Sequence, residues 1–348
     1  MSSRHVFDLS ARPPELAAAA GSIAIADAKS FPILKRMSLR RLRLAPGGLR
    51  EPHWHANAHE LGYCLAGSAL VTVALNHAAR ESFLVEAGEM FFAPSGSLHA
   101  IRNAGEAEAE FVLAFSHELP EDFGLRAAFG AMTPAVLGNA FDAPAAALAP
   151  LSAAARAAGV PSIHPVAALP AIEPQARHTS PLKFRIEAGL PEIASPAGSA
   201  KQSEAALWPA LEDLSMFSVR ISDAGMREPH WHPETAEMGY VLAGQGRMTI
   251  LDPDGSTDTY AIGPGDVYFI PRAYPHHIED TGSGELHILI FFDRATPGDI
   301  GFRTLVGALA RDTLAATFGI AEAELPAFPF AEEDPLIVGR VNPVDPAL

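Results

Sequence analysis

The sequence predicts an all-β protein made of two tandem β-barrel domains, each followed by short accessory helices. Two observations support this fold class. Short runs rich in valine, isoleucine, phenylalanine and tyrosine alternate with glycine, proline and aspartate, which is typical of the many short strands of a sandwich or barrel. The second half of the chain also repeats the first half in the same order. One architecture is therefore expected twice.

The expected strands occur at matching places in the two halves. Each is a run of β-favouring residues bounded by turn-forming residues. The clearest examples are residues 70–75, 89–93 and 110–115 in the first half, and residues 247–251 and 266–270 in the second half. The sequence Asp252-Pro253-Asp254-Gly255 after one of these runs predicts a hairpin turn.

The repeat is fixed by a run of six residues, Arg-Glu-Pro-His-Trp-His, which begins at Arg50 and again at Arg227. The offset between these two arginines stays constant, without a gap, from Phe31 to Gly124 in the first copy. A repeat of this length is large enough to close its own core, so it indicates a duplicated domain.

This register divides the chain into two domains and two connecting segments. We expect a first domain over residues 1–140, an alanine- and proline-rich linker over 141–180, a second domain over 181–325 and a tail over 326–348. Helices are expected at the end of each domain, over residues 125–140 and 302–318, where apolar residues recur at helical spacing.

The histidines of the repeated run have the spacing of metal ligands on a strand. Side chains alternate between the two faces of a strand, so His53 and His55 point the same way and Trp54 points away. Residues 56–59 read as a turn, which lets Glu60 join the same face from the next strand. The repeat adds His99 as the fourth ligand. The second copy gives the matching set His230, His232, Glu237 and His276, with Trp231 facing away.

Three imidazoles and one carboxylate favour a transition metal over calcium or magnesium. Manganese, iron, cobalt, nickel and zinc all fit this donor set. Six-coordinate geometry leaves two adjacent positions for water, dioxygen or a substrate carboxylate, which indicates a catalytic site. The alternative is that these histidines are ordinary core residues, but two complete sets at identical spacing argue against it.

Composition and charge restrict the partners. The sequence has 41 acidic and 25 basic residues, which gives a formal net charge of -16. This charge disfavours nucleic acid and anionic membrane surfaces as partners. We find no apolar stretch long enough for a membrane span and no secretory signal, and Cys64 is the single cysteine. We therefore expect a cytoplasmic protein. A buried position is expected for Cys64, and surface positions for His59 and His277.

The pattern Gly-x4-His-x-His-x4-Glu-x6-Gly, followed by Gly-x5-Pro-x4-His, resembles the paired motif of the cupin superfamily. One copy occupies residues 48–67 with 88–99, and the other occupies 225–244 with 265–276. The chain thus resembles the bicupins over about residues 22–325, and its Arg-Glu-x-His-Trp-His variant is most similar to the oxalate decarboxylase family. The resemblance implies jelly-roll barrels, two manganese ions per chain and a homo-oligomer.

In the resembled family an arginine at the position of Arg50 grips a substrate carboxylate. The resemblance gives this role to Arg50 in the first half and to Arg227 in the second. A planar guanidinium is suited to pairing with one end of a small dicarboxylate. The alternative is a structural ion pair, with Glu51 or Glu228 as the partner.

The family's decarboxylases also use an acidic residue on a loop after the last strand as a proton donor. The best match here is Glu121, with Asp122 as the alternative if the register shifts by one. The loop departs from the family's Ser-Glu-Asn-Ser pattern. In the second half, Gly298 stands at the position of Glu121 and Asp299 at that of Asp122. If one half carries the reaction, the sequence favours the first.

Three functional hypotheses follow. The first is a manganese oxalate decarboxylase that uses dioxygen as co-catalyst and yields formate and carbon dioxide. The second is another metal-dependent cupin oxidase or dioxygenase that acts on a small carboxylic acid. The third is a non-catalytic bicupin that binds or stores metal.

Overall fold

The structure is a computed structural model, and it describes residues 3–156, 161–166, 179–329 and 331–344. The described chain forms two compact units. One unit contains Arg12–Ala188 and Trp208–Leu214, and the other contains Met1–Ala11, Gly189–Leu207 and Ser215–Leu348. Each unit is a barrel of two antiparallel sheets, so the predicted all-β architecture of two tandem barrels with short helices is confirmed.

The first barrel is closed by a seven-stranded sheet and a second sheet that carries most of the ligand strands. The first sheet has the order β14-β9-β6-β11-β4-β3-β2 and the second has the order β12-β5-β10-β7-β8, with β13 also paired to β5. Their bounds are β2 Leu16–Ala18, β3 Gly21–Ala26, β4 Ser38–Leu44, β5 Gly48–His55, β6 Glu60–Ala66, β7 Ser68–Ala74, β8 Arg80–Glu86, β9 Met90–Ala93, β10 Leu98–Asn103, β11 Ala109–Phe115, β12 Asp122–Gly124, β13 Ile163–Pro165 and β14 Lys183–Phe184.

The second barrel repeats this arrangement. Its sheets have the orders β1-β22-β19-β24-β17-β16-β15 and β21-β20-β23-β18-β25, with β26 paired to β18. Their bounds are β1 Val6–Asp8, β15 Ile193–Ser195, β16 Gly198–Ser203, β17 Ser215–Ile221, β18 Gly225–Trp231, β19 Glu237–Ala243, β20 Gly246–Leu251, β21 Thr257–Ile262, β22 Asp266–Ile270, β23 His276–Asp280, β24 Leu286–Phe292, β25 Ile300–Gly301 and β26 Ile337–Gly339.

The core of each barrel comes from the inward side chains of alternating strand residues. In β7 the pattern is regular, because Ala69, Val71 and Val73 are buried while their neighbours are partly exposed. Large aromatic side chains such as Phe111 and Tyr268 fill the interiors, where they are fully buried. Burial of such side chains is the main favourable term in the folding of each barrel.

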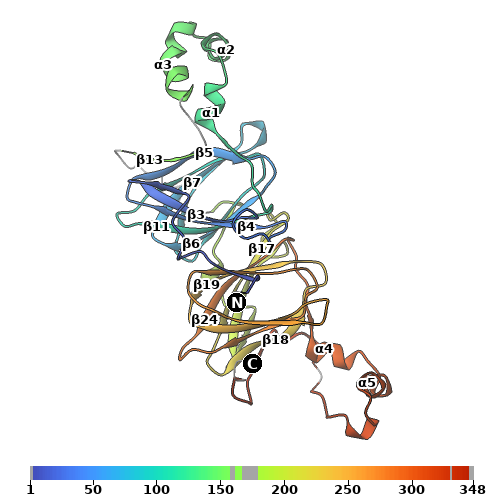
Figure 1. Cartoon of the computed structure of the whole chain (residues 1–348). Helices are drawn as coiled ribbons and strands as arrows, with labels where there is room; N and C mark the ends of the chain where they lie inside the picture. The colour runs from blue at the N-terminus through green and yellow to red at the C-terminus, as the bar shows by residue number, and fades with distance from the viewer. Residues whose placement is uncertain (1–2, 157–160, 167–178, 330, 345–348) are drawn as a thin grey trace. The chain divides into compact units, whose positions relative to one another are not determined.

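The helices of each half lie outside the barrel, as Figure 1 shows for α1, α2 and α3 beyond β5 and for α4 and α5 near β18. Each predicted helical segment is broken into two. Residues 125–140 form α1 (Leu125–Gly130) and α2 (Pro134–Ala140), because Thr133 caps a new helix by accepting a hydrogen bond from the Val136 amide. Residues 302–318 form α4 (Phe302–Gly307) and α5 (Arg311–Phe318), because Ala310 is extended.

Three elements lie where the sequence indicated little regular structure. The segment expected as a linker contains α3 (Ala145–Arg156) and β13, while its residues 157–160 and 167–178 lie outside the described chain. The segment expected as a tail contains β26. Short 3₁₀ turns occur at η1 Asn76–Ala78, η3 Ile186–Ala188 and η4 Glu322–Glu324. The described chain contains no helix long and apolar enough to cross a bilayer.

Candidate metal centres

Four buried side chains converge inside the first barrel. His53 and His55 come from β5, Glu60 is the first residue of β6, and His99 lies on β10. One ligand atom from each lies within 4.8 Å of all the others. The turn before β6 carries the carboxylate onto the face of the two histidines, and the pairing of His99 with His53 across β10 and β5 completes the set.

The second barrel holds an equivalent set. His230, His232, Glu237 and His276 are buried, and their ligand atoms also lie within 4.8 Å of one another. His230 pairs with His276 across β18 and β23. The structure therefore brings together both sets of four residues that the repeat indicated, and two metal-binding clusters of histidine and glutamate are present.

A bulge in each ligand strand brings the arginine to the same side as the histidines. Arg50 and His53 are three residues apart, so on a regular strand they would face opposite ways. The pairing of β5 with β10 shifts its register between His99 and Ile101, and Pro52 lies in this irregular stretch. The same shift occurs between Arg227 and His230 in β18. A bulge therefore positions an arginine beside each metal cluster.

The hydrogen bonds of the histidines show that these residues fit a metal. Nδ1 of His53 lies 2.7 Å from the Glu51 carbonyl oxygen, and Nδ1 of His99 lies 2.9 Å from that of Ser97. Each Nδ1 therefore carries the proton, and each Nε2 lone pair faces the cluster. In the second cluster, Nε2 of His230 is buried without a hydrogen-bond partner in the described chain. A cation at each cluster would satisfy these lone pairs.

For one histidine and the glutamate of each cluster, electrostatics favours the protonation state that a metal needs, whereas the neighbouring carboxylates raise the pKa of the other strand histidine, His55 or His232. Burial and the nearby Arg50 hold the pKa of His53 well below its usual range, and burial and Arg227 do the same for His230. Burial would raise the pKa of Glu60, but His99 and His55 beside it lower it overall. Two neutral imidazoles with an ionised carboxylate are the forms that bind a divalent cation.

A carboxylate orients one histidine in each cluster. Nδ1 of His55 lies 2.7 Å from Oδ1 of Asp122, and Nδ1 of His232 lies 2.6 Å from Oδ1 of Asp299. Burial would raise the pKa of Asp122, but its hydrogen bonds with His55 and Arg40 lower it overall. A carboxylate on the outer nitrogen fixes the ring orientation and raises the basicity of a metal-binding imidazole.

The two arginines differ in how they are held. Arg50 donates to the Pro161 carbonyl oxygen, and its Nη2 lies 3.6 Å from Asp122. Arg227 donates to the Leu336 carbonyl oxygen at 2.9 Å and to Asp299 at 2.6 Å. The acidic partners of the arginines are thus Asp122 and Asp299, which the arginines reach on the inner face, whereas the sequence suggested Glu51 or Glu228.

The carboxylate ligands also have different surroundings in the two barrels. The Tyr268 hydroxyl donates to Oε1 of Glu237 at 2.7 Å, and Gly239 permits this because a Cβ there would lie 2.1 Å from the Tyr268 ring. Phe91 occupies the equivalent position of the first barrel, and Oε1 of Glu60 is buried without a hydrogen-bond partner in the described residues. The first cluster therefore has a less restrained carboxylate.

The sequence did not single out Arg40. This residue lies on β4, donates to Asp122 at 2.6 and 3.1 Å, and lies 4.5 Å from the centre of the Phe115 ring. Phe115 in turn packs edge-on against His55, with ring centres 4.9 Å apart. At the equivalent position of the second barrel stands Phe217, which packs against Phe292. Neither the repeat nor a local pattern singles out this arginine, because its partner Asp122 is 82 residues away in the sequence.

The residue considered as a proton donor, Glu121, is exposed and immediately precedes β12. Its amide donates to Oδ1 of Asn57 at 2.9 Å, and its carbonyl oxygen accepts from the Ala56 amide at 2.9 Å. The backbone of this loop is therefore attached next to the ligand His55, while the Glu121 side chain faces solvent. Asp122, the alternative, is committed to Arg40 and His55.

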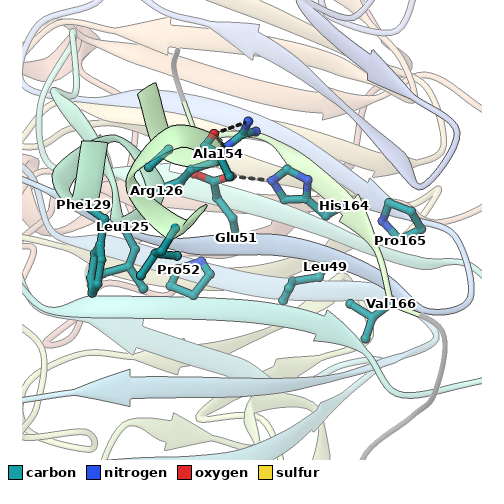
Figure 2. A pocket seen from close by; sticks show the side chains of 12 residues that line it. Leu49, Glu51, Pro52, Leu125, Arg126, Phe129, Ala154, His164, Pro165 and Val166 are labelled. Atoms are coloured by element: carbon teal, nitrogen blue, oxygen red, sulfur yellow. Dashed lines mark hydrogen bonds and ion pairs between the residues drawn. The ribbon is translucent and has the colours of Figure 1, made fainter. Parts of the chain in front are cut away.

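The outer face of β5 carries a hollow of about 610 Å³ (Figure 2). Glu51 lies there and bonds His164 at 2.5 Å, and Arg126 bonds the Ala154 carbonyl oxygen at 3.0 Å. The walls are otherwise mainly apolar side chains from α1, α3 and β13. Glu51 therefore faces away from the ligand set.

Other residues considered from the sequence lie outside the ligand sets. Trp54 stacks on Phe123, at a ring distance of 5.6 Å, and Cys64 is buried as expected. His59 is partly exposed, and its ring stacks on Phe92 at a distance of 5.4 Å. His277 is partly buried and lies 3.8 Å from Glu279. None of these four residues belongs to a ligand set.

Comparison with known proteins gives one family for both halves. The model of the cupin family matches residues 7–146 and 185–325. Among curated proteins, oxalate decarboxylase OxdC of Bacillus subtilis is 29% identical over 270 residues, which cover 76% of this chain and 69% of that protein. A probable oxalate decarboxylase of Arthroderma benhamiae is 26% identical over 287 residues, covering 80% of this chain and 70% of that protein.

Solved structures agree with the fold. The structure of oxalate decarboxylase from Bacillus subtilis at pH 4.6 superimposes with a TM-score of 0.84 at 24% identity, and it covers 98% of this chain and 88% of that chain. A structure with the same coverage of this chain and a TM-score of 0.83 concerns the Mn(II) centres of that enzyme. The fold of two tandem barrels is therefore shared over nearly the whole chain.

Proposed function

The chain belongs to the cupin family, and from this premise we propose that it is a metal-dependent oxalate decarboxylase with two metal sites per chain. The observation that carries the proposal is a buried arginine beside each set of three histidines and one glutamate. Such a site can hold a metal and one end of a small dicarboxylate together. The similarity to proteins named oxalate decarboxylase supports oxalate as that acid.

Manganese is the metal that we propose for both sites, because the related Bacillus subtilis enzyme has Mn(II) centres. Iron, cobalt, nickel and zinc also suit the donor set. When bound, the metal would supply Lewis-acid and redox chemistry, with dioxygen as co-catalyst. Its ligands would be the four residues of each set.

The residues of the first barrel would bind and orient the substrate. Arg50 would pair with the carboxylate of oxalate that lies away from the metal, because a guanidinium can donate two parallel hydrogen bonds. Phe115 packs against His55 and excludes water from that side of the site. Oxalate would thereby be held in one orientation.

The reaction also needs a proton, since an oxalate dianion and one proton yield formate and carbon dioxide. We assign its delivery to the carboxyl group of Glu121, which lies on the loop attached to the ligand strand. Asp122 is unsuited to this role because the guanidinium of Arg40 and the imidazole of His55 keep its carboxylate ionised. Reorientation of the exposed Glu121 side chain toward the site would be part of each turnover.

An oxalate oxidase is the second candidate, and the exposed Glu121 side chain is the observation that favours it. Without a proton donor, both carbons would leave as carbon dioxide, and dioxygen with two protons would take up the two electrons as hydrogen peroxide. Glu121→Gln tests the choice in manganese-loaded protein at mildly acidic pH. We expect formate formation to fall at least about 100-fold, the size of a general-acid contribution.

Glu118→Gln is the matched control, because Glu118 lies on the same loop and its side chain bonds the Arg36 amide, away from the cluster. It should keep the formate yield of the wild type. A Glu121→Gln variant with full formate production would contradict the assignment of the proton donor, whereas peroxide as the main product of the wild type would favour the oxidase.

We also propose a homo-oligomer in the cytoplasm. Apolar side chains are exposed on the helices outside the barrels, among them Val136 and Leu151 in the first half and Phe318 in the second. Such groups favour association between copies. The single cysteine is compatible with a reducing compartment. Light scattering on the purified chain would measure the number of copies.

A further inference from the structure

The two metal clusters differ in the charges that surround them. In the first barrel Arg40 and Arg50 balance the carboxylates of Glu60 and Asp122. If the histidines are neutral, a bound divalent metal would therefore give the first cluster a net charge of two positive units. Among the described residues of the second barrel, Arg227 is the one arginine that offsets Glu237 and Asp299, so a divalent metal would give this cluster one surplus positive charge. Because these groups are buried, water screens the difference only weakly.

Arg40 also changes what Arg50 can bind. Nη1 and Nη2 of Arg40 donate hydrogen bonds to the two carboxylate oxygens of Asp122, at 2.6 and 3.1 Å. Arg50 lies 3.6 Å from Asp122, beyond the usual length of a hydrogen bond. Asp122 is thus held by Arg40 and by His55. An incoming carboxylate can pair with Arg50 without displacing an acid that is already bonded to it.

The second barrel shows the arrangement without this arginine. Phe217 replaces Arg40, and Arg227 now donates directly to Asp299 at 2.6 Å. A substrate carboxylate would have to compete with Asp299 for the same guanidinium. Its approach would also bring a dianion to a site with a single surplus positive charge.

We propose that Arg40 determines the substrate specificity of the first site, by occupying Asp122 so that Arg50 and two surplus positive charges are free for a dianionic dicarboxylate. Arg40 is a positioning residue, since it acts through Asp122 and Arg50. The second site, which lacks it, binds dicarboxylates weakly. This inference rests on the proposed function, because it names which of the two sites takes the dianion.

The packing around Arg40 supports a role beyond stability. Its guanidinium lies over the Phe115 ring, which itself contacts His55, so the arginine belongs to the wall of the cluster. Its Nε atom is buried and lacks a hydrogen-bond partner in the described chain. Burial and the nearby charge of Arg40 lower the pKa of Arg50 to about 10, which still leaves Arg50 charged at neutral pH.

The test is calorimetry of oxalate binding to manganese-loaded protein without dioxygen, with malonate as a second dicarboxylate and acetate as a monoanion. The wild type should show one strong oxalate site per chain although two metals are bound. Arg40→Phe, which copies the second barrel, should weaken that site about 10- to 100-fold, as expected for the loss of a charged hydrogen-bonding partner. Acetate binding should change much less.

A matched control is Arg41→Gln. Arg41 is the next residue of β4, and it pairs with Glu110 instead of Asp122, so the variant loses the same charge away from the cluster. Oxalate binding should remain within about twofold of the wild type, because solvent and salt screen a partly exposed charge at a distance.

Rescue distinguishes positioning from a merely structural role. In the double variant Arg40→Phe/Asp122→Asn, Arg50 loses its competing acid and the surplus of two positive charges returns. At a manganese concentration high enough to fill the weakened first site, which metal analysis checks, oxalate affinity should recover most of its loss. If Arg40→Phe does not fold, Phe217→Arg provides the same test in the other direction, since it should create a second strong oxalate site.

These measurements distinguish a failure of the proposed function from a failure of the role of Arg40. Wild-type protein that holds both metals but binds no oxalate would overturn the proposed function itself. Oxalate binding that is as tight in Arg40→Phe as in Arg41→Gln would overturn only the role of Arg40. Two equally strong oxalate sites in the wild type would also overturn the role of Arg40.

Discussion

Nδ1 of His55 lies 2.7 Å from a carboxylate oxygen of Asp122, a residue 67 positions later on a different strand. The pairing of β12 with β5 sets His55 directly opposite Asp122 and produces this contact. In the second barrel, Nδ1 of His232 lies 2.6 Å from Oδ1 of Asp299, just beyond the ends of the paired strands β18 and β25. Each metal cluster thus includes a fifth residue that acts through a ligand.

Loss of that carboxylate should weaken metal binding at one site only. We expect Asp122→Ala to lower the metal affinity of the first site about 10- to 100-fold, because the His55 ring loses the partner that orients it. Titration with manganese, followed by metal analysis, measures this for each site. Glu121→Ala is the neighbouring control and should bind two metals as the wild type does. Unchanged affinity in Asp122→Ala would show that the contact has no effect on the ligand.

The Tyr268 hydroxyl should stabilise the metal-free second barrel. Burial and the nearby Glu237 raise the pKa of Tyr268 well above its usual range, so the hydroxyl keeps its proton and donates. Tyr268→Phe leaves a buried carboxylate oxygen without that donor, which costs about 1–3 kcal/mol. Denaturant unfolding of the metal-free protein checks this prediction. The reverse change, Phe91→Tyr, should raise stability; a loss in both variants would argue against the role of the hydroxyl.

Glu228, which lies on β18, should make the stability of the fold depend on pH. Burial and the neighbouring carboxyl of Asp334 raise the pKa of Glu228 to about 8. Between about pH 4.5 and pH 8, Glu228 therefore carries a proton in the folded state but not in the unfolded chain. The stability that this proton provides is fully present below pH 4.5 and is lost as the pH rises through about 8. We expect a loss of about 1–3 kcal/mol between pH 6 and pH 8.

Asp334→Asn tests this dependence, because an amide removes the like charge. The variant should be more stable than the wild type at pH 8 and should show a flatter profile in thermal unfolding. Glu333→Gln, at an exposed neighbouring position, is the control and should keep the wild-type slope. A wild-type profile that is flat between pH 6 and pH 8 would rule out a proton shared by Glu228 and Asp334.

The ligands could be predicted from the sequence because their contacts are local or repeated. His53 and His55 share a strand face by parity, and the constant offset between the two copies matches His99 with His276. Arg40 could not be found in this way, since Phe217 stands at its repeat position. Its role depends on where β12 places Asp122, a tertiary contact that no local pattern reports.

The strands that hold the arginines were missed for a similar reason. Pro161 and Leu336 supply the carbonyl oxygens that bond Arg50 and Arg227. Pro161 lies in the sequence Pro-Ser-Ile at the start of β13, and Leu336 lies in Pro-Leu-Ile at the start of β26. The spacing between these two sequences is three residues shorter than the offset of the main repeat, which conceals their correspondence. Strands of three residues also have too little pattern to predict alone.

The most direct measurement is the fate of oxalate labelled with ¹³C at both carbons, followed by NMR in aerated buffer with manganese bound at both sites. A decarboxylase predicts one labelled formate and one labelled carbon dioxide for each oxalate consumed, with little peroxide. Protein that carries two manganese ions per chain and leaves the labelled oxalate unchanged would contradict the proposed function.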